Sequence, residues 1–127
     1  MIHGIGTDIC RVARFDRMIE RYGERTARRL LGQDEFDEYS RVAHPGRFLA
    51  RRFAAKEAFA KALGTGIREP VLFSAMQITH DALGKPQLAC TGALQELVCG
   101  QALTVHLSIS DEAEFATAFV VIERTQP

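Results

Sequence analysis

The sequence lacks several features that define whole classes of protein. Its 127 residues carry no net charge at pH 7, with 16 basic and 16 acidic side chains, which argues against a protein that coats nucleic acid. No segment reaches the ~18 apolar residues of a membrane span. Residues 1–6 have neither a basic leader nor a long apolar region, so we expect no secretory signal. We therefore expect a cytoplasmic protein that binds neither nucleic acid nor a membrane.

Cysteine is also scarce. Cys10, Cys90 and Cys99 are odd in number and show no CxxC spacing, so we expect reduced, structural cysteines and no zinc site. The chain has no internal repeat and no low-complexity tract. Its length suits one domain over residues 1–127, and its apolar content of 46% is that of an ordinary globular protein.

The opening residues predict a strand over residues 2–9. A period of two puts Gly4, Gly6 and Asp8 on one face of it. Two glycines in a strand indicate the close approach of another backbone or of a ligand. Asp8 is expected either to cap the following helix or to bind a cation.

The remaining pattern predicts the order of helices and strands. Helices are expected over residues 11–31, 33–42, 47–63 and 92–101. Strands are expected over residues 76–80, 87–90, 104–110 and 115–123, the first two joined as a hairpin. Asp111 is expected to cap a turn, and residues 125–127 to form a frayed tail. This order predicts an α+β domain with a mainly antiparallel sheet packed by helices.

The helix predicted over residues 11–31 carries a basic face. From Arg11 to Arg29 there are seven arginines and three acidic residues, a local excess of four positive charges. A solvated face with internal ion pairs explains such a run. A docking surface for an acidic partner also explains it, because charge complementarity raises association rates. Structured RNA is the alternative acidic partner.

The helix predicted over residues 47–63 carries the residues best suited to chemistry. Phe53, Glu57 and Lys61 are four residues apart and line one face. A carboxylate can hold a hard divalent cation, and an ammonium can neutralise phosphate. Gly64 is expected as a left-handed cap, and the turn at residues 64–66 is expected to leave backbone N–H groups open to an anion. The alternative is an ordinary helix-supporting pair worth about 0.2–0.5 kcal/mol.

Three stretches are distinctive when taken together. They are Gly4-Ile5-Gly6-Thr7-Asp8-Ile9, the block from Arg52 to Ile67, and His106-Leu107-Ser108-Ile109-Ser110 before the closing strand. This combination resembles the holo-[acyl-carrier-protein] synthases, the small 4'-phosphopantetheinyl transferases of bacterial fatty-acid synthesis. The Phe-x-x-Lys-Glu-Ala-x-x-Lys pattern inside the block is specific to that superfamily. The chain length fits its short, trimeric type, so the resemblance implies the 4'-phosphopantetheinyl transferase fold and a homotrimer with sites between subunits.

The resemblance also implies a reaction. Phosphopantetheine would pass from coenzyme A to a serine of apo-acyl carrier protein, releasing adenosine 3',5'-bisphosphate, with Mg²⁺ as cofactor. Asp8 and Glu57 match the magnesium ligands, and Lys61 matches the lysine near the coenzyme A phosphates; these three are the implied catalytic residues. Glu57 or a metal-bound water would take the serine proton. The implied coenzyme A contacts are Arg52, Phe53, Lys61, Gly64, Thr65, Gly66 and Ile67 in one subunit, and Lys85, Pro86, Ser108 and Ser110 in its neighbour.

The basic first helix matches the surface that docks acyl carrier protein. The contacts implied there are Arg14, Met18, Arg21 and Arg25. One departure concerns the end of the penultimate strand, where many relatives have Ser-His or Thr-His and this chain has Ser110-Asp111-Glu112. No catalytic histidine is carried over, and His106 is expected to be packed or hydrogen-bonded. A related transferase that serves carriers of polyketide or peptide synthesis is the alternative within this resemblance.

Overall fold

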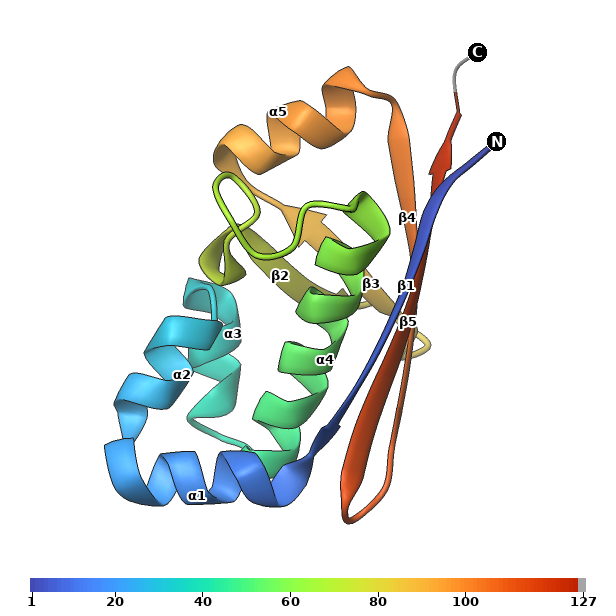
Figure 1. Cartoon of the computed structure of the whole chain (residues 1–127). Coiled ribbons are helices and arrows are strands. Elements are labelled where there is room, and N and C mark those ends of the chain that lie inside the picture. The colour runs from blue at the N-terminus through green and yellow to red at the C-terminus, as the bar shows by residue number, and fades with distance from the viewer. Residues whose placement is uncertain (126–127) are drawn as a thin grey trace.

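The computed structural model describes residues 1–125, in which one long helix packs on an antiparallel sheet (Figure 1). The elements in chain order are β1 (Ile2–Arg11), α1 (Val12–Tyr22), α2 (Glu24–Leu30), α3 (Gln33–Tyr39), α4 (Pro45–Leu63), the short 3₁₀ helix η1 (Phe73–Ala75), β2 (Met76–His80), β3 (Pro86–Cys90), α5 (Gly92–Gly100), β4 (Leu103–Asp111) and β5 (Phe115–Arg124). The predicted α+β class is confirmed.

The strands form two antiparallel sheets. The larger one has the order β1-β5-β4, and the β2–β3 hairpin forms a second, two-stranded sheet. The helix α4 covers one face of the larger sheet, and in residues 1–125 no helix covers the other face (Figure 1). Across that sheet Thr7 pairs with Phe119, which pairs with Ser108. These three side chains therefore share one face of the sheet.

The strand β1 lies directly on α4. A Cβ added at Gly4 would come 2.0 Å from the Ala62 carbonyl oxygen, and one added at Gly6 would come 2.0 Å from the Ala58 carbonyl oxygen. Only glycine permits this approach, so the predicted close contact is one between two backbones. It brings the Asp8 side of β1 against the C-terminal half of α4.

The long helix predicted over residues 11–31 is two helices. Gly23 separates α1 from α2 with φ 61° and ψ −138°, a conformation outside the helical region. The chain turns there, so α2 leaves the end of α1 at a steep angle and runs beside α3 (Figure 1). The start of α4 also differs from the prediction, because Pro45 occupies the first helical turn, where its missing N–H is tolerated.

Three smaller expectations change. Asp8 does not cap a helix, since β1 continues to Arg11, which is the N-cap of α1. Asp111 caps no turn: it ends β4, with its carboxylate 3.6 Å from both Arg47 Nε and Arg51 Nη1. Thr125 is not frayed, because its N–H donates to the Ala102 carbonyl at 2.9 Å. Residues 126 and 127 of the predicted tail lie outside the described residues.

Two other expectations hold, that the cysteines are unpaired and that His106 is hydrogen-bonded. All three cysteines are free thiols, and Cys10 Sγ donates to the Ala50 carbonyl at 3.2 Å. Within residues 1–125, no helix has the length and apolar character needed to cross a membrane. His106 is hydrogen-bonded as expected, with Nε2 2.6 Å from Glu123 Oε1.

Candidate active site

Asp8, Glu57 and Lys61 come together where β1 crosses α4. Lys61 Nζ donates to the Thr7 carbonyl at 3.0 Å and to Asp8 Oδ1 at 3.2 Å. Glu57 lies one helical turn before Lys61 on the same face of α4. Two segments far apart in sequence thus supply two carboxylates and an ammonium to one place.

The two carboxylates are close enough to affect each other. Burial raises the pKa of Glu57 above its ordinary value, the Asp8 charge raises it further, and Lys61 and Arg14 oppose the shift. Asp8 Oδ2 is buried and has no hydrogen-bond partner among residues 1–125. A buried carboxylate oxygen without a donor is costly, so this atom is arranged for a ligand outside the chain.

These residues fit a magnesium ion. Among residues 1–125, no group of three or more His, Cys, Asp or Glu side chains could hold a metal, and Asp8 and Glu57 are the two carboxylates that come close at this site. Magnesium commonly takes one or two carboxylates, keeps several waters and binds substrate phosphates. The unpartnered Asp8 Oδ2 and the neighbouring Glu57 suit that mode of binding.

The turn after α4 differs from its prediction. Gly64 has the expected left-handed conformation, with φ 85°. However, the N–H groups of Gly64, Thr65 and Gly66 all donate to the Ala60 carbonyl, at 3.1, 3.3 and 3.3 Å. They close the helix end, so the expectation that they stand open to an anion is wrong. Any contact of this turn with an anion must therefore use atoms other than these three N–H groups.

Arg52 also departs from its predicted role. Its side chain is 4% exposed, and its guanidinium bonds the Ile78 carbonyl and Glu38 Oε1, both at 3.2 Å. The family resemblance implies that Arg52 contacts coenzyme A, but its guanidinium is engaged by groups inside the protein. We therefore assign it to the interior.

Phe53 forms part of an apolar groove beside the acidic site. Its ring centroid lies 5.3 Å from that of Phe15 and 5.8 Å from that of Phe73, and the Arg14 guanidinium lies 4.9 Å above it. The groove has a volume of about 350 Å³. It is lined by Arg14, Phe15, Met18, Thr26, Arg29, Leu30, Phe53 and Phe73. We call this the aromatic groove.

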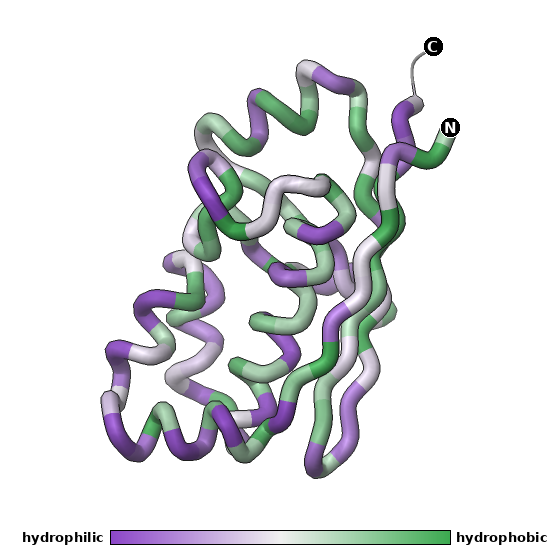
Figure 2. Tube along the Cα trace, in the orientation of Figure 1, coloured by the Kyte–Doolittle hydropathy of each residue, from purple (hydrophilic) through white to green (hydrophobic). Residues whose placement is uncertain are grey.

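The predicted partner residues share one surface. Arg14, Met18 and Arg21 line a hollow on α1, and Met18 and Arg25 line the next hollow, towards α2. Hydrophilic residues recur along α1 in Figure 2. This surface continues across the break at Gly23, because Thr26 Oγ1 on α2 donates to the Met18 carbonyl on α1 at 3.1 Å.

The residues predicted for the neighbouring subunit lie elsewhere. Ser108 and Ser110 are on the face of β4 that points away from α4, since Leu107 next to Ser108 is buried on the opposite face. Lys85 is in the hairpin turn, and Pro86 lines a separate cavity of about 370 Å³ with Arg51, His80 and Asp111 among its lining residues. Within one chain these residues do not join the Asp8–Glu57 site.

Lys56, for which no role was predicted, is completely buried and donates to the carbonyls of Leu30 and Phe73, which line the aromatic groove. A lysine is almost never fully buried unless it is paired. One signal was present: Arg52 and Lys56 are four residues apart and lie among alanines and phenylalanines. Charged residues on an otherwise apolar helix face indicate buried pairing.

Comparison with known proteins identifies the family of the chain. The family described as the 4'-phosphopantetheinyl transferase superfamily matches residues 4–120. The holo-[acyl-carrier-protein] synthase of Laribacter hongkongensis is 55% identical over 124 residues, which cover 97% of this chain and 99% of that protein.

Two crystal structures have the same fold. The holo-[acyl-carrier-protein] synthase of Neisseria meningitidis superimposes with a TM-score of 0.92 at 48% identity, over 97% of this chain and 99% of that one. The Bacillus anthracis enzyme of the same name, in complex with coenzyme A (3',5'-ADP), superimposes with a TM-score of 0.81 at 38% identity, over 98% and 99%.

Proposed function

The chain belongs to the 4'-phosphopantetheinyl transferase superfamily, and we propose that Asp8, Glu57 and Lys61 form the centre of its reaction. It transfers the 4'-phosphopantetheine group from coenzyme A to a serine of apo-acyl carrier protein and releases adenosine 3',5'-bisphosphate. The observation that carries the site assignment is the buried, unpartnered Asp8 Oδ2 next to Glu57. We place the reaction in cytoplasmic fatty-acid biosynthesis.

The reaction replaces one P–O bond with another. The serine oxygen bonds to the phosphorus next to the pantetheine, the bond from that phosphorus to the leaving phosphate breaks, and the serine proton moves to a base. Most of the catalysis is positioning and neutralisation of charge. Glu57 is a carboxylate of this centre and is a candidate to accept the proton. Lys61 is placed to neutralise charge on the leaving oxygen.

Asp8 and Glu57 would hold a magnesium ion. When bound, it would polarise the attacked phosphate and neutralise charge on the leaving group. Lys61 is 55% exposed and donates to Asp8 from the solvent side. Its ammonium can therefore turn from the carboxylate to a phosphate without leaving a buried donor unpaired.

A mass-shift assay tests this centre. Asp8→Ala and Glu57→Ala should each lower the rate of carrier modification, with coenzyme A and magnesium present, by about a hundredfold or more. Both variants should keep the wild-type circular dichroism spectrum. Glu96→Ala, which removes an exposed carboxylate from α5, serves as the matched control. Magnesium-dependent activity that persists in both site variants would refute the metal assignment.

We infer that the carrier protein docks on the α1–α2 surface and the aromatic groove. Arg14, Arg21 and Arg25 are exposed there beside the partly buried Met18. An acidic partner gains from the positive field, and the apolar groove can receive an apolar side chain. Arg14 contacts Phe53 and also affects the Glu57 pKa, so it links this surface to the reaction centre.

Charge reversal tests the docking surface. Arg21→Glu should raise the KM for carrier protein by about tenfold and leave the KM for coenzyme A unchanged. Arg41→Glu, an equal charge reversal at an exposed position after α3, should change neither constant. An unchanged carrier KM in Arg21→Glu would remove α1 from the interface.

We also infer a homotrimer that completes each site with residues of a neighbour. The sheet face away from α4 exposes Ile5, Ile9 and Phe119 to 60%, 63% and 46%, which is an unusual apolar surface for a monomer. Ser108 and Ser110 lie on this same face. Light scattering should give three times the mass of the chain, and Phe119→Arg should give a monomer with weakened coenzyme A binding.

A further inference from the structure

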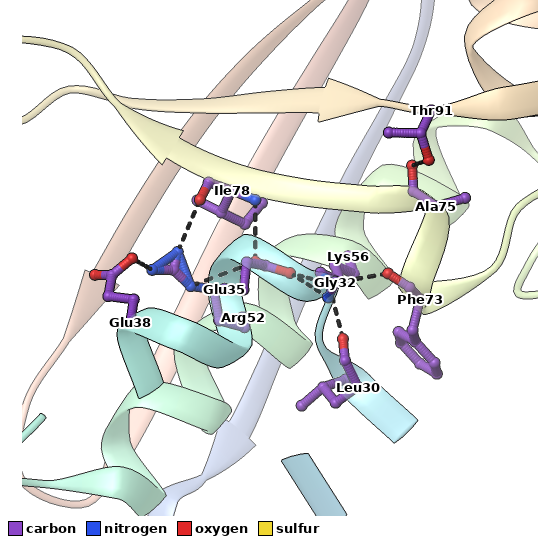
Figure 3. A network of polar contacts seen from close by, with 10 residues as sticks. All are labelled: Leu30, Gly32, Glu35, Glu38, Arg52, Lys56, Phe73, Ala75, Ile78 and Thr91. Carbon is purple, nitrogen blue, oxygen red and sulfur yellow. Dashed lines mark hydrogen bonds and ion pairs between the residues drawn. The ribbon is translucent and has the colours of Figure 1, made fainter. Parts of the chain in front are cut away.

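Lys56 precedes Glu57 on α4 but points into the protein. Its side chain is 0% exposed. Its ammonium donates to the Leu30 carbonyl at 2.7 Å, to Glu35 Oε1 at 2.7 Å and to the Phe73 carbonyl at 2.9 Å (Figure 3). An ammonium has three donors, so its hydrogen-bonding capacity is filled. The three acceptors belong to α2, α3 and η1.

Glu35 joins Lys56 to the rest of this buried network. Its side chain is 2% exposed, Oε1 also accepts from the Gly32 N–H at 3.1 Å, and Oε2 accepts from the Ile78 N–H at 3.0 Å. Arg52 Nε lies 3.5 Å from Oε2. Buried ion pairs add little net stability, because the loss of hydration offsets their attraction. A geometric role explains this network better than a stabilising one.

Two of the Lys56 acceptors belong to the walls of the aromatic groove. Leu30 and Phe73 both line it, together with Phe53 of α4. Lys56 binds their backbone carbonyls, so it fixes the main chain of both walls and not only a side chain. The same helix carries Glu57 at the next position. The ammonium thus ties the α2 wall and the η1 wall to the helix that holds the reaction centre.

We propose that Lys56 is a positioning residue for carrier-protein binding. It holds the walls of the aromatic groove at a fixed position relative to Glu57. This inference rests on the proposed docking of the carrier at that groove. Without the ammonium, the two walls lose their common anchor and sample several separations. The carrier then binds more weakly and presents its serine less often. Of the coenzyme A contacts that the resemblance implies, only Phe53 lines this groove, so coenzyme A binding is affected much less.

Paired variants separate positioning from stability. Lys56→Met keeps the length of the side chain but leaves the Glu35 carboxylate short of one cation, so we expect it to unfold more easily. The double variant Lys56→Met/Glu35→Gln removes both charges and relieves that penalty, but still lacks the bonds to Leu30 and Phe73. Both should raise the carrier KM by about tenfold or more, with less than about a twofold change in the coenzyme A KM. Lys56→Gln, which keeps two donors, should fall between wild type and Lys56→Met.

The control is a variant that destabilises the fold elsewhere. Leu94→Ala opens a cavity at a completely buried position of α5, does not touch the groove, and should leave the carrier KM at the wild-type value. A wild-type carrier KM in the folded double variant would overturn the inference, as would an equal rise in Leu94→Ala. If Arg21→Glu raises the carrier KM and the Lys56 variants do not, docking stands and the positioning role fails. If none of them raises it, the docking proposal fails first.

Discussion

Lys61 donates a hydrogen bond from its ammonium to Asp8 Oδ1 at 3.2 Å, across 53 residues of sequence. The same carboxylate has its other oxygen buried without a partner in residues 1–125. The Lys61 ammonium and a metal ion would therefore both bind the Asp8 carboxylate. Because both are positively charged, the ammonium lowers the affinity of the site for the metal ion. This relationship predicts a measurable competition.

Lys61→Met should bind divalent metal more tightly than the wild type, although it loses activity. A partly exposed ion pair is worth about 0.2–1 kcal/mol, so the dissociation constant should fall by up to about fivefold. Titration with Mn²⁺, followed by electron paramagnetic resonance without coenzyme A, measures this directly. Arg41→Met removes an exposed cation after α3 and should leave the metal affinity unchanged. Weaker metal binding in Lys61→Met would mean that Lys61 helps to hold the ion.

Gly6→Ala should destabilise the fold strongly, because the added Cβ would come 2.0 Å from the Ala58 carbonyl oxygen. Overpacking of this kind costs about 1–3 kcal/mol or more. Gly100→Ala is the control, since a Cβ there meets nothing within 4 Å and alanine suits a helix better than glycine. Urea denaturation of both variants measures the difference. Equal stability of the two would mean that β1 lies further from α4 than described.

The sequence predicted the acidic centre but not its surroundings, for physical reasons. Asp8 lies in a regular strand and Glu57 in a regular helix, so the residue spacing predicted on which face of its element each side chain lies. The family resemblance predicted that the two carboxylates act together. Gly23 inside a helical pattern costs only about 1 kcal/mol, so nothing local revealed that the chain turns there.

The partners of the buried cations were beyond local reasoning for another reason. The pattern around Arg52 and Lys56 indicates buried pairing, but it does not reveal that the acceptors lie in α2, α3, η1 and β2. The N–H groups at residues 64–66 were misjudged because the sequence does not reveal that they share the Ala60 carbonyl. Both errors concern partners that are set by three-dimensional packing.

Glu57→Gln should stabilise the protein at neutral pH. Folding raises the pKa of Glu57 above 4.5 through burial and through Asp8, so the ionised carboxylate is less favourable in the folded chain than in the unfolded one. The stability that comes from the neutral Glu57 carboxyl is present below pH 4.5. It is lost as the pH rises through the pKa of Glu57 in the folded protein. Urea denaturation should show Glu57→Gln more stable than wild type at pH 7 and equal to it near about pH 3. Glu96→Gln should have the stability of the wild type at both pH values. If Glu57→Gln were more stable than the wild type by the same amount at both pH values, the effect would not come from the charge of Glu57.

The three thiols should differ sharply in reactivity. Burial raises the pKa of Cys10 and Cys90 to about 11, with the Asp8 charge adding to the effect at Cys10. Since the thiolate is the reactive form, about one in a thousand of these two groups is ionised at pH 8. Cys99 is exposed on α5. A disulfide reagent should therefore modify one thiol per native chain quickly and all three in denaturant, and Cys99→Ser should abolish the fast phase. Two fast thiols in the native wild type would show that β1 or β3 opens readily, which the packing of β1 on α4 opposes.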